Sequence, residues 1–167
     1  MPSIEEGNLT FVFPKNWLAE KYDQWLFHVR DFQHVCGGAK AVDILAVNLA
    51  ICCWLIEIKD YRPGCRTTAL ELADTVAAKV RDTLAGLATA RVRAAGGEQR
   101  AAEASLDCAN LRIVLHMEQP ATTSVLFPAL INRANVLQRL RQLIKAIDPS
   151  PQVVDMNSSQ NLPWTVT

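Results

Sequence analysis

The sequence predicts a mixed α/β fold in which a central sheet of parallel and antiparallel strands is flanked by helices. Two short apolar runs follow one another at residues 41–47 and 51–58, and a long segment with apolar residues at helical spacing comes directly after them. A run at residues 111–117 that alternates well follows that helix. Elements in this order are typical of a mixed sheet covered by helices. A chain of 167 residues can bury a core, and its length predicts one domain over residues 1–167.

Composition limits the function classes. Lys plus Arg equals Asp plus Glu at 17 each, so the formal net charge is zero. This argues against binding of duplex nucleic acid by the whole surface, but it leaves room for a local basic patch. The five cysteines lack Cys-x-x-Cys spacing, which predicts reduced thiols in a cytoplasmic protein. The first residues have neither the basic nor the apolar region of a signal peptide, so no export is expected.

The first forty residues are predicted to hold a short edge strand at residues 9–13 and a helix at residues 16–23. Pro14 suits the start of that helix, and Trp17 and Leu18 would form its apolar side. The next segment, residues 25–35, fits both the alternation of a strand and the spacing of a helix.

The two apolar runs are predicted to be neighbouring strands, and they contain three charged residues. A buried charge costs several kcal/mol unless it is paired or binds a metal, so Asp43, Glu57 and Lys59 are anomalies in such runs. If the runs pair as a hairpin with its midpoint near Ala50, Asp43 lies directly opposite Glu57. Because side chains alternate along a strand, Glu57 and Lys59 then share a face.

Two carboxylates at that distance repel one another unless a cation lies between them. Oxygen ligands with an open part of the shell suit Mg²⁺ or Mn²⁺, and a lysine beside the ion can polarise a water or offset negative charge. The residues therefore favour metal-assisted hydrolysis of a phosphodiester. The alternative is a solvated strand edge with a surface ion pair. A transmembrane helix over residues 41–58 is excluded, because Asp43 and Glu57 would lie inside it and Asn48 at its centre.

The pattern of Asp43 followed by Glu57-x-Lys59 resembles the signature of the PD-(D/E)xK nuclease superfamily. The run W-L-I-E-I-K-D-Y-R at residues 54–62 is similar to its IExKDYR variant, and Val42 stands where the family name has proline. The resemblance implies a restriction-endonuclease-like αβββαβ core. It also implies that Asp43 and Glu57 ligate a divalent metal (Mg or Mn), that the Ile58 carbonyl adds to the shell, and that Lys59 is the catalytic lysine.

The resemblance carries further expectations. The first helix of the family often supplies one more acid to the site, for which Asp23 or Glu20 is a candidate; a surface acid is the alternative for each. Because a helix precedes a three-stranded meander in the family, a strand is favoured within residues 25–35. Independently of the resemblance, the nuclease hypothesis makes Tyr61, on the same face if the strand continues, and Arg62 and Arg66 beyond it candidates for orienting the substrate.

A long helix is predicted from residue 68 to about residue 95. Thr68 and Glu71 form a capping box, and apolar residues follow at helical spacing: Leu72, Val76, Val80, Leu84 and Leu87. Its many alanines allow close packing against a sheet or another helix, which leaves a homodimer open. A shorter helix at residues 98–106 is interpreted as an insertion.

The remaining chain is predicted to form a strand at residues 111–117, a helix at residues 127–147, a strand at residues 152–156 and an edge strand at residues 162–166. His116 on the first of these strands is a candidate for the site, although a lone histidine on a strand is more often structural. The long helix carries a basic face, either solvated or in contact with phosphates, made of Arg133, Arg139, Arg141 and Lys145.

Three functions are compatible with these residues. The first is a metal-dependent nuclease or nuclease-like phosphodiesterase, with nucleic acid as partner and DNA favoured over RNA. The second is a catalytically inactive protein of the same fold that binds nucleic acid or serves in an assembly, because fold does not fix function. The third, weaker one is hydrolysis of another phosphate ester.

Overall fold

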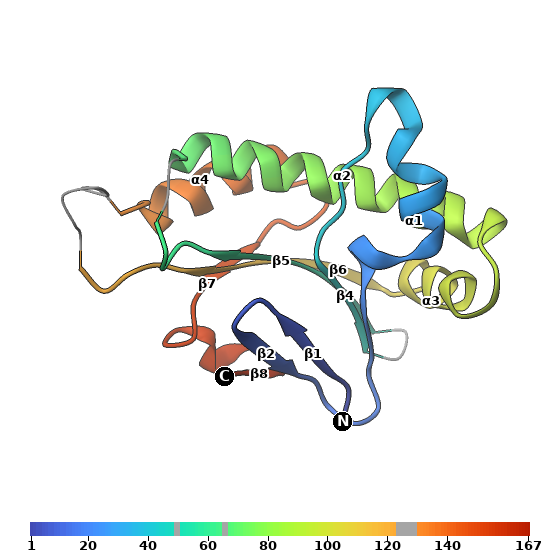
Figure 1. Cartoon of the computed structure of the whole chain (residues 1–167), viewed down its shortest axis with the longest axis horizontal. Helices are drawn as coiled ribbons and strands as arrows, with labels where there is room; N and C mark the ends of the chain where they lie inside the picture. The colour runs from blue at the N-terminus through green and yellow to red at the C-terminus, as the bar shows by residue number, and fades with distance from the viewer. Residues whose placement is uncertain (49–50, 65–66, 123–129) are drawn as a thin grey trace.

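A five-stranded mixed sheet forms the centre of the molecule (Figure 1). The computed structural model describes residues 1–48, 51–64, 67–122 and 130–167. The first three strands of the sheet are antiparallel, and the last three are parallel to one another. In spatial order the strands are β3 (Leu18–Lys21), β4 (Ile44–Asn48), β5 (Cys52–Asp60), β6 (Asn110–Glu118) and β7 (Gln152–Val154). The predicted mixed sheet with flanking helices is confirmed.

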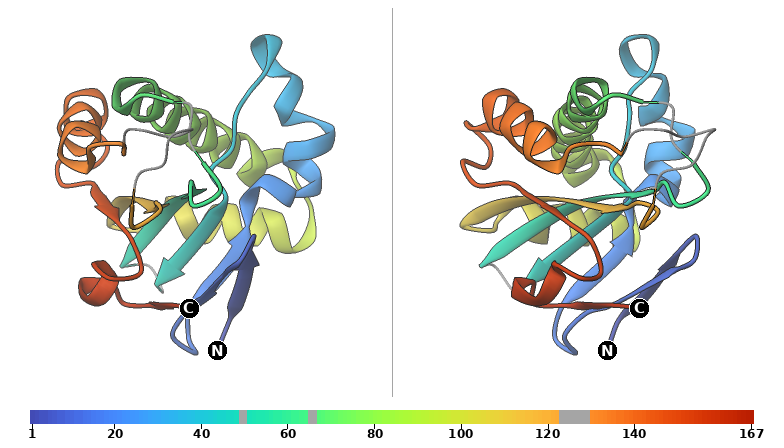
Figure 2. Two further views of the ribbon diagram at one scale, coloured as in Figure 1. Left: turned by 60° about the vertical axis from the view of Figure 1, so that its left-hand side comes forward. Right: turned by 90° about the vertical axis from the view of Figure 1, so that its left-hand side faces the viewer.

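Three helices cover one face of this sheet: α2 (Ala69–Arg93), α3 (Gly96–Leu106) and α4 (Arg133–Ile144). Figure 2 shows α2 and α4 side by side above the strands. The predicted capping box begins α2, because the Glu71 backbone N–H donates to the Thr68 hydroxyl oxygen and the Glu71 carboxylate accepts from the Thr68 N–H. The alanine-rich α2 packs against α3 and α4 of its own chain, while a homodimer remains a prediction.

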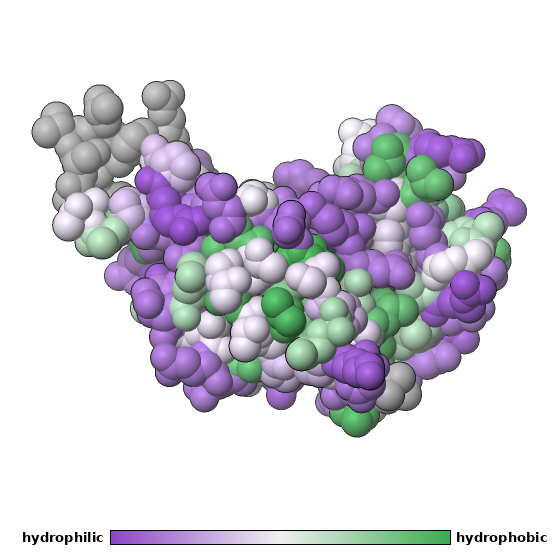
Figure 3. All heavy atoms as spheres, turned by 60° about the horizontal axis from the view of Figure 1, so that its bottom comes forward, coloured by the Kyte–Doolittle hydropathy of each residue, from purple (hydrophilic) through white to green (hydrophobic). Residues whose placement is uncertain are grey.

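The other face is covered by a small sheet in the order β1-β2-β8, formed by Ser3–Glu6, Leu9–Val12 and Thr165–Val166. Backbone bonds between Thr10 and Thr167 (2.7 and 3.0 Å) hold the last strand against the second. Strands lie near both predicted positions, but β2 is the central strand of this small sheet, so of the two only β8 is an edge strand. Strand β1 was not predicted from the sequence. The outer side of this layer is a mosaic of hydrophilic and hydrophobic residues (Figure 3).

Two hydrophobic cores separate these layers. One lies between the sheet and the helices and includes Leu55, Val76 and Leu115. The other lies between the two sheets and includes Phe11, Ile56 and Trp164. Successive residues of β5 therefore alternate between the cores, as the period of a strand requires. In the described part of the chain, no helix combines the length and the apolar character needed to cross a membrane.

The predicted helix at residues 16–23 is wrong. Residues 18–21 form β3, which pairs with β4 in the register Leu18↔Val47 to Lys21↔Ile44, and a 3₁₀ turn (Tyr22–Gln24) follows. Ala19 and Glu20 are good helix formers, but the open edge of β4 offers their backbone a ladder of hydrogen bonds that local propensity cannot reveal.

The strand favoured within residues 25–35 is also wrong, because this segment forms α1 (Leu26–Arg30) and a 3₁₀ segment (Phe32–Gly37). The Glu98 carboxylate accepts from the backbone N–H groups of Leu26 (2.6 Å) and Phe27 (3.0 Å), so a distant residue caps the helix. The predicted order of a helix followed by a strand is thus reversed in this part of the chain. In sequence, the short helix α1 lies between β3 and β4.

The C-terminal elements differ mainly in their bounds. The strand predicted at residues 111–117 is confirmed as β6. The helix predicted from residue 127 begins only at Arg133; residues 127–129 lie outside the described residues. The Asn132 side chain accepts from the Asn135 N–H (3.2 Å) and caps α4 there, while Ile131 is held by Gln119 through bonds of 2.7 and 3.1 Å. Strand β7 ends at Val154, two residues before the predicted end.

Gly86 on α2 makes room for Tyr22. A Cβ at position 86 would lie 2.1 Å from the Tyr22 hydroxyl oxygen and 3.2 Å from the Phe32 ring. We expect Gly86→Ala to lower the free energy of unfolding, because overpacking costs about 1–3 kcal/mol and outweighs a helix-propensity gain of about 1 kcal/mol. The buried Tyr22 hydroxyl has no hydrogen-bond partner among the described residues, so Tyr22→Phe should remove the clash at little cost. Urea unfolding of the two single variants and the double variant measures the free energies of unfolding. The double variant should be more stable than Gly86→Ala, and equal stability of the two would contradict the predicted clash.

Candidate active site

The pairing of β4 with β5 brings Asp43 opposite Glu57. The ladder runs from Asn48↔Cys52 to Ile44↔Ile56, and one further step along it sets Asp43 against Glu57. The Ile58 backbone N–H donates to Asp43 Oδ2 (2.6 Å), which fixes the aspartate side chain against the neighbouring strand. The predicted juxtaposition of Asp43 and Glu57 is confirmed.

Glu57 and Lys59 both face the helices. Leu55, two residues earlier on β5, belongs to the core beneath α2, while Ile56 and Ile58 point into the core between the sheets. The Glu57 side chain is completely buried and Lys59 is 28% exposed, with Lys59 Nζ lying 2.7 Å from Glu57 Oε1. The three residues that the sequence singled out therefore meet on one face. A ligand role for the Ile58 carbonyl stays a prediction.

A second lysine, Lys79 on α2, completes the group and was missed by the sequence analysis. Its Nζ lies 2.6 Å from Glu57 Oε1 and 3.4 Å from Asp43 Oδ1, and its side chain is 18% exposed. Its position carries a signal, since it falls seven residues after Leu72 and four before Thr83, both buried on α2. A lone lysine on the buried stripe of the helix that follows the Glu-x-Lys strand points to this site.

The charges of this group are unequally stabilised. Burial raises the pKa of Glu57, the nearby Asp43 raises it further, and Lys79 and Lys59 oppose the shift. Burial acts to lower the pKa of Lys59, but the Glu57 carboxylate outweighs it and the pKa is raised. Burial and the charge of Asp43 together thus outweigh the two lysines at Glu57, whereas Lys59 is held in its charged form.

Of the two candidates for an additional acid, Asp23 lies nearer the site. It sits in the 3₁₀ turn after β3, beside Tyr22, whose N–H donates to the Asp43 carbonyl (3.0 Å). Burial raises the pKa of Asp23, and the charge of Asp43 raises it further. Glu20 instead lines a cavity of about 560 Å³ with Trp25 and other residues.

Asp43 and Glu57 are the pair of carboxylates in this group that could hold a divalent cation. Glu57 Oε2 is buried and has no hydrogen-bond partner in the described chain, so one carboxylate oxygen is left to bind an ion. Among the described residues, no third Asp, Glu, His or Cys joins them in a group that could hold a metal. Mg²⁺ often takes one or two carboxylates and completes its shell with water and phosphate oxygens, so two ligands suffice.

Two of the three predicted substrate-orienting residues, Tyr61 and Arg62, lie in the described part of the chain, and they have different surroundings. Tyr61 packs at the edge of the core beneath the helices, on the side of Lys59. The Arg62 guanidinium is paired with Asp60 (2.5 Å), which alternation turns to the opposite face of the sheet. Arg66 lies outside the described residues. The roles of all three stay predictions.

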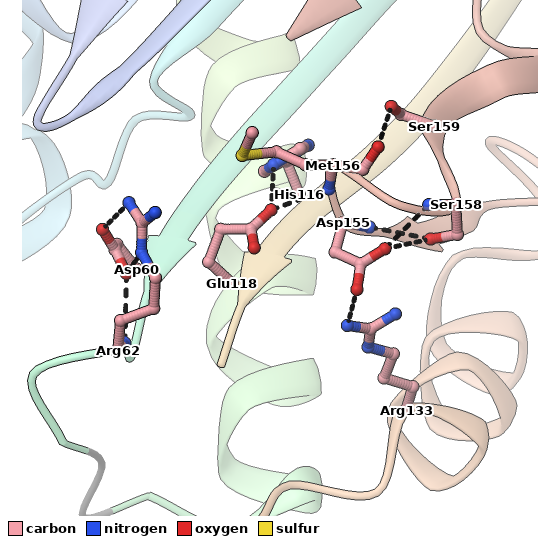
Figure 4. Close-up of polar contacts among 9 residues, drawn as sticks. All are labelled: Asp60, Arg62, His116, Glu118, Arg133, Asp155, Met156, Ser158 and Ser159. Atoms are coloured by element: carbon pink, nitrogen blue, oxygen red, sulfur yellow. Dashed lines mark hydrogen bonds and ion pairs between the residues drawn. The ribbon is translucent and has the colours of Figure 1, made fainter. Parts of the chain in front are cut away.

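His116 lies on the far face of the sheet from Glu57. Its ring packs edge-on against Phe11 at 5.2 Å between centroids, and its Nε2 lies 2.8 Å from Glu118 Oε1, which also accepts from the Met156 N–H (Figure 4). Burial lowers the pKa of His116, although Glu118 opposes the shift.

Figure 4 shows a second cluster of polar contacts, centred on Asp155, beside this pair. Asp155 accepts from the Arg133 guanidinium and from the Ser158 N–H (2.8 Å) and hydroxyl (2.6 Å). These bonds fasten the start of α4 and the turn after β7 to the end of the sheet, which favours the structural reading of His116 and its neighbours.

Comparison with known proteins gives one curated relative. The chain is 32% identical, over an alignment of 210 residues, to a cysteine–tRNA ligase of Neisseria meningitidis serogroup A. The alignment covers the whole of this chain but only 30% of that protein. No protein-family model matches the chain, and no solved structure matches it.

The burial of Glu57 predicts a pH-dependent effect of Glu57→Gln. The pKa of Glu57 is raised in the folded protein, so the folded state favours the protonated carboxyl. The folded protein keeps this stabilisation in full below pH 4.5 and loses it as the pH rises through the folded-state pKa of Glu57. Glutamine mimics the protonated form at every pH. We expect the free energies of unfolding of variant and wild type to agree below pH 4.5 and the variant to become the more stable above it. Urea unfolding to about pH 8 tests this, with the exposed Glu5→Gln as control; a variant that is less stable at neutral pH contradicts it.

Proposed function

We propose that this chain is a divalent-metal-dependent nuclease or nuclease-like phosphodiesterase of the PD-(D/E)xK type. The observation that carries the proposal is the meeting of Asp43, Glu57 and Lys59 on one face of the sheet, where the carboxylates oppose one another. A fully buried glutamate with an unpartnered oxygen is costly to keep for stability alone. Such groups mark sites where charge is used.

The order of elements supports a restriction-endonuclease-like core. Strands β3, β4 and β5 form an antiparallel meander, α2 follows, and β6 then joins β5 in parallel. This agrees with the βββαβ part of the implied core, with α3 as an insertion between helix and strand. The leading helix of the family order has no counterpart before β3, where β1 and β2 stand instead.

The residues divide the chemistry among themselves. Asp43 and Glu57 would hold Mg²⁺ or Mn²⁺, whose positive charge stabilises the charge that develops on a phosphodiester during hydrolysis. Lys59, held in its charged form by Glu57, orients the attacking water and offsets negative charge on the phosphate. The helices above the site and the sheet beneath it limit access of bulk water to Glu57.

Removal of Lys59 or Glu57 tests the catalytic proposal. With Mn²⁺ and labelled single- and double-stranded DNA and RNA, including tRNA, we expect the wild type to cleave at least one substrate. Lys59→Ala and Glu57→Gln should slow cleavage by about a hundredfold or more, the usual range for loss of a proton-transfer or charge-stabilising group. The exposed Lys15→Ala is the matched control and should cleave at the wild-type rate. Cleavage that survives both site substitutions at full rate rules out this active site.

A second candidate is a nucleic-acid-binding or assembly module without chemistry. The observation in its favour is the relative, whose name describes an enzyme that joins cysteine to tRNA and of which the matched region is only 30%. The two lysines also cancel the two carboxylates, so the group can persist as a neutral ion-pair cluster.

Thermal unfolding with and without Mn²⁺ separates the two candidates. A metal that binds only the folded state raises the melting temperature in proportion to the logarithm of its concentration. The phosphodiesterase predicts a rise in the wild type that is lost in the Asp43→Asn variant. A binding module predicts equal melting temperatures with and without Mn²⁺, together with tRNA binding that does not depend on Glu57.

A further inference from the structure

Lys79 places a positive charge between the two carboxylates of the site. Its Nζ contacts Glu57 Oε1 at 2.6 Å and lies 3.4 Å from Asp43 Oδ1, so one ammonium group bridges residues from β4 and β5. Lys59 reaches only Glu57 among the site acids, at 2.7 Å. Lys79 therefore bridges Asp43 and Glu57, in addition to the backbone pairing of the two strands.

The bridging ammonium and a divalent ion would occupy the same space between two carboxylates, even though Glu57 Oε2 is left unpartnered by the lysines. Both would bind between Asp43 and Glu57, and Glu57 Oε1 already contacts two ammonium groups. A divalent ion a few ångström from an ammonium is strongly repelled in a partly buried site. The lysine stem is flexible and 18% of the side chain is exposed, so Nζ has a way out toward solvent.

We propose that Lys79 is the built-in cation of the free site, that a divalent metal displaces its ammonium, and that the displaced ammonium then binds a phosphate oxygen of the substrate. This inference rests on the proposed metal-dependent function. Its consequence is that metal and phosphate bind cooperatively. Metal entry frees a cation for phosphate, phosphate stabilises the displaced lysine, and by linkage each raises the affinity of the other.

Metal affinity in the absence of substrate tests the displacement. We expect Lys79→Met to bind Mn²⁺ about tenfold more tightly than wild type in isothermal titration calorimetry of the full chain, because the ion no longer has to remove a bound ammonium. The Lys79→Gln variant, which is neutral but polar, should behave in the same way and guards against a folding defect of the methionine variant. Without metal, both variants should melt below wild type, because Asp43 and Glu57 then face one another with Lys59 alone to offset their charge.

Lys21→Met is the matched control for charge alone. Its ammonium is paired with Glu6 (2.6 Å), which raises the pKa of Lys21 most, and the more distant Asp43 adds to that shift. Lys21 therefore interacts electrostatically with Asp43 but makes its ion pair with Glu6. We expect its removal to change Mn²⁺ affinity less than about twofold, well inside the tenfold effect expected at Lys79.

Coupling to phosphate gives a second readout that does not depend on turnover. An oligothymidylate with phosphorothioate linkages should raise Mn²⁺ affinity in the wild type more than in Lys79→Met, by about tenfold, because only the wild type has a displaced ammonium to bind it. Equal enhancement in both proteins would falsify the phosphate role of Lys79.

The outcomes distinguish this inference from the proposed function. If the wild type binds Mn²⁺ and cleaves, but the Lys79 variants bind Mn²⁺ no more tightly, the displacement is wrong and the function stands. If Lys21→Met tightens binding as much as Lys79→Met, the effect is general repulsion and the displacement is again wrong. If neither wild type nor Lys79→Met binds Mn²⁺, both the inference and the proposed metal site fail.

Discussion

The site depends on the register in which β4 pairs with β5. Side chains alternate along a strand, so a shift of one residue would turn Asp43 to the face occupied by Ile56 and Ile58 and leave Glu57 without its opposing acid. Two different cores hold the register, because each strand buries apolar residues on both faces. Packing that any α/β protein needs for stability thus also brings the charged residues together.

The buried environment that positions the charged group also destabilises the ionised form of Glu57. Glu57 is completely buried, its pKa is raised by that burial, and one of its oxygens has no partner among the described residues. Four charges that sum to zero limit this cost without removing it. Ion pairs on a surface carry no comparable cost, so this buried group is the part of the sheet that packing alone does not explain.

Some of this arrangement could be predicted from residues near one another in the sequence. The apolar runs with their three charged interruptions gave both strands, their pairing and the meeting of Asp43, Glu57 and Lys59; the capping box gave the start of α2. What failed was determined at long range. Residues 18–21 became a strand because the edge of β4 was open to them, and α1 formed where Glu98 caps it from more than seventy residues away. Lys79 was missed for another reason. Its contacts with Asp43 and Glu57 depend on how α2 packs on the sheet, which the sequence pattern does not specify.

Tyr22 joins the two halves of the site through its backbone and its ring. Its N–H holds the Asp43 carbonyl, and its hydroxyl abuts α2 at Gly86, two helical turns beyond Lys79. The tyrosine therefore packs between the lysine-bearing helix and the chain segment that contains Asp43. A smaller or larger side chain at position 22 is therefore expected to move Asp43 and Lys79 relative to one another, without itself belonging to the charged group.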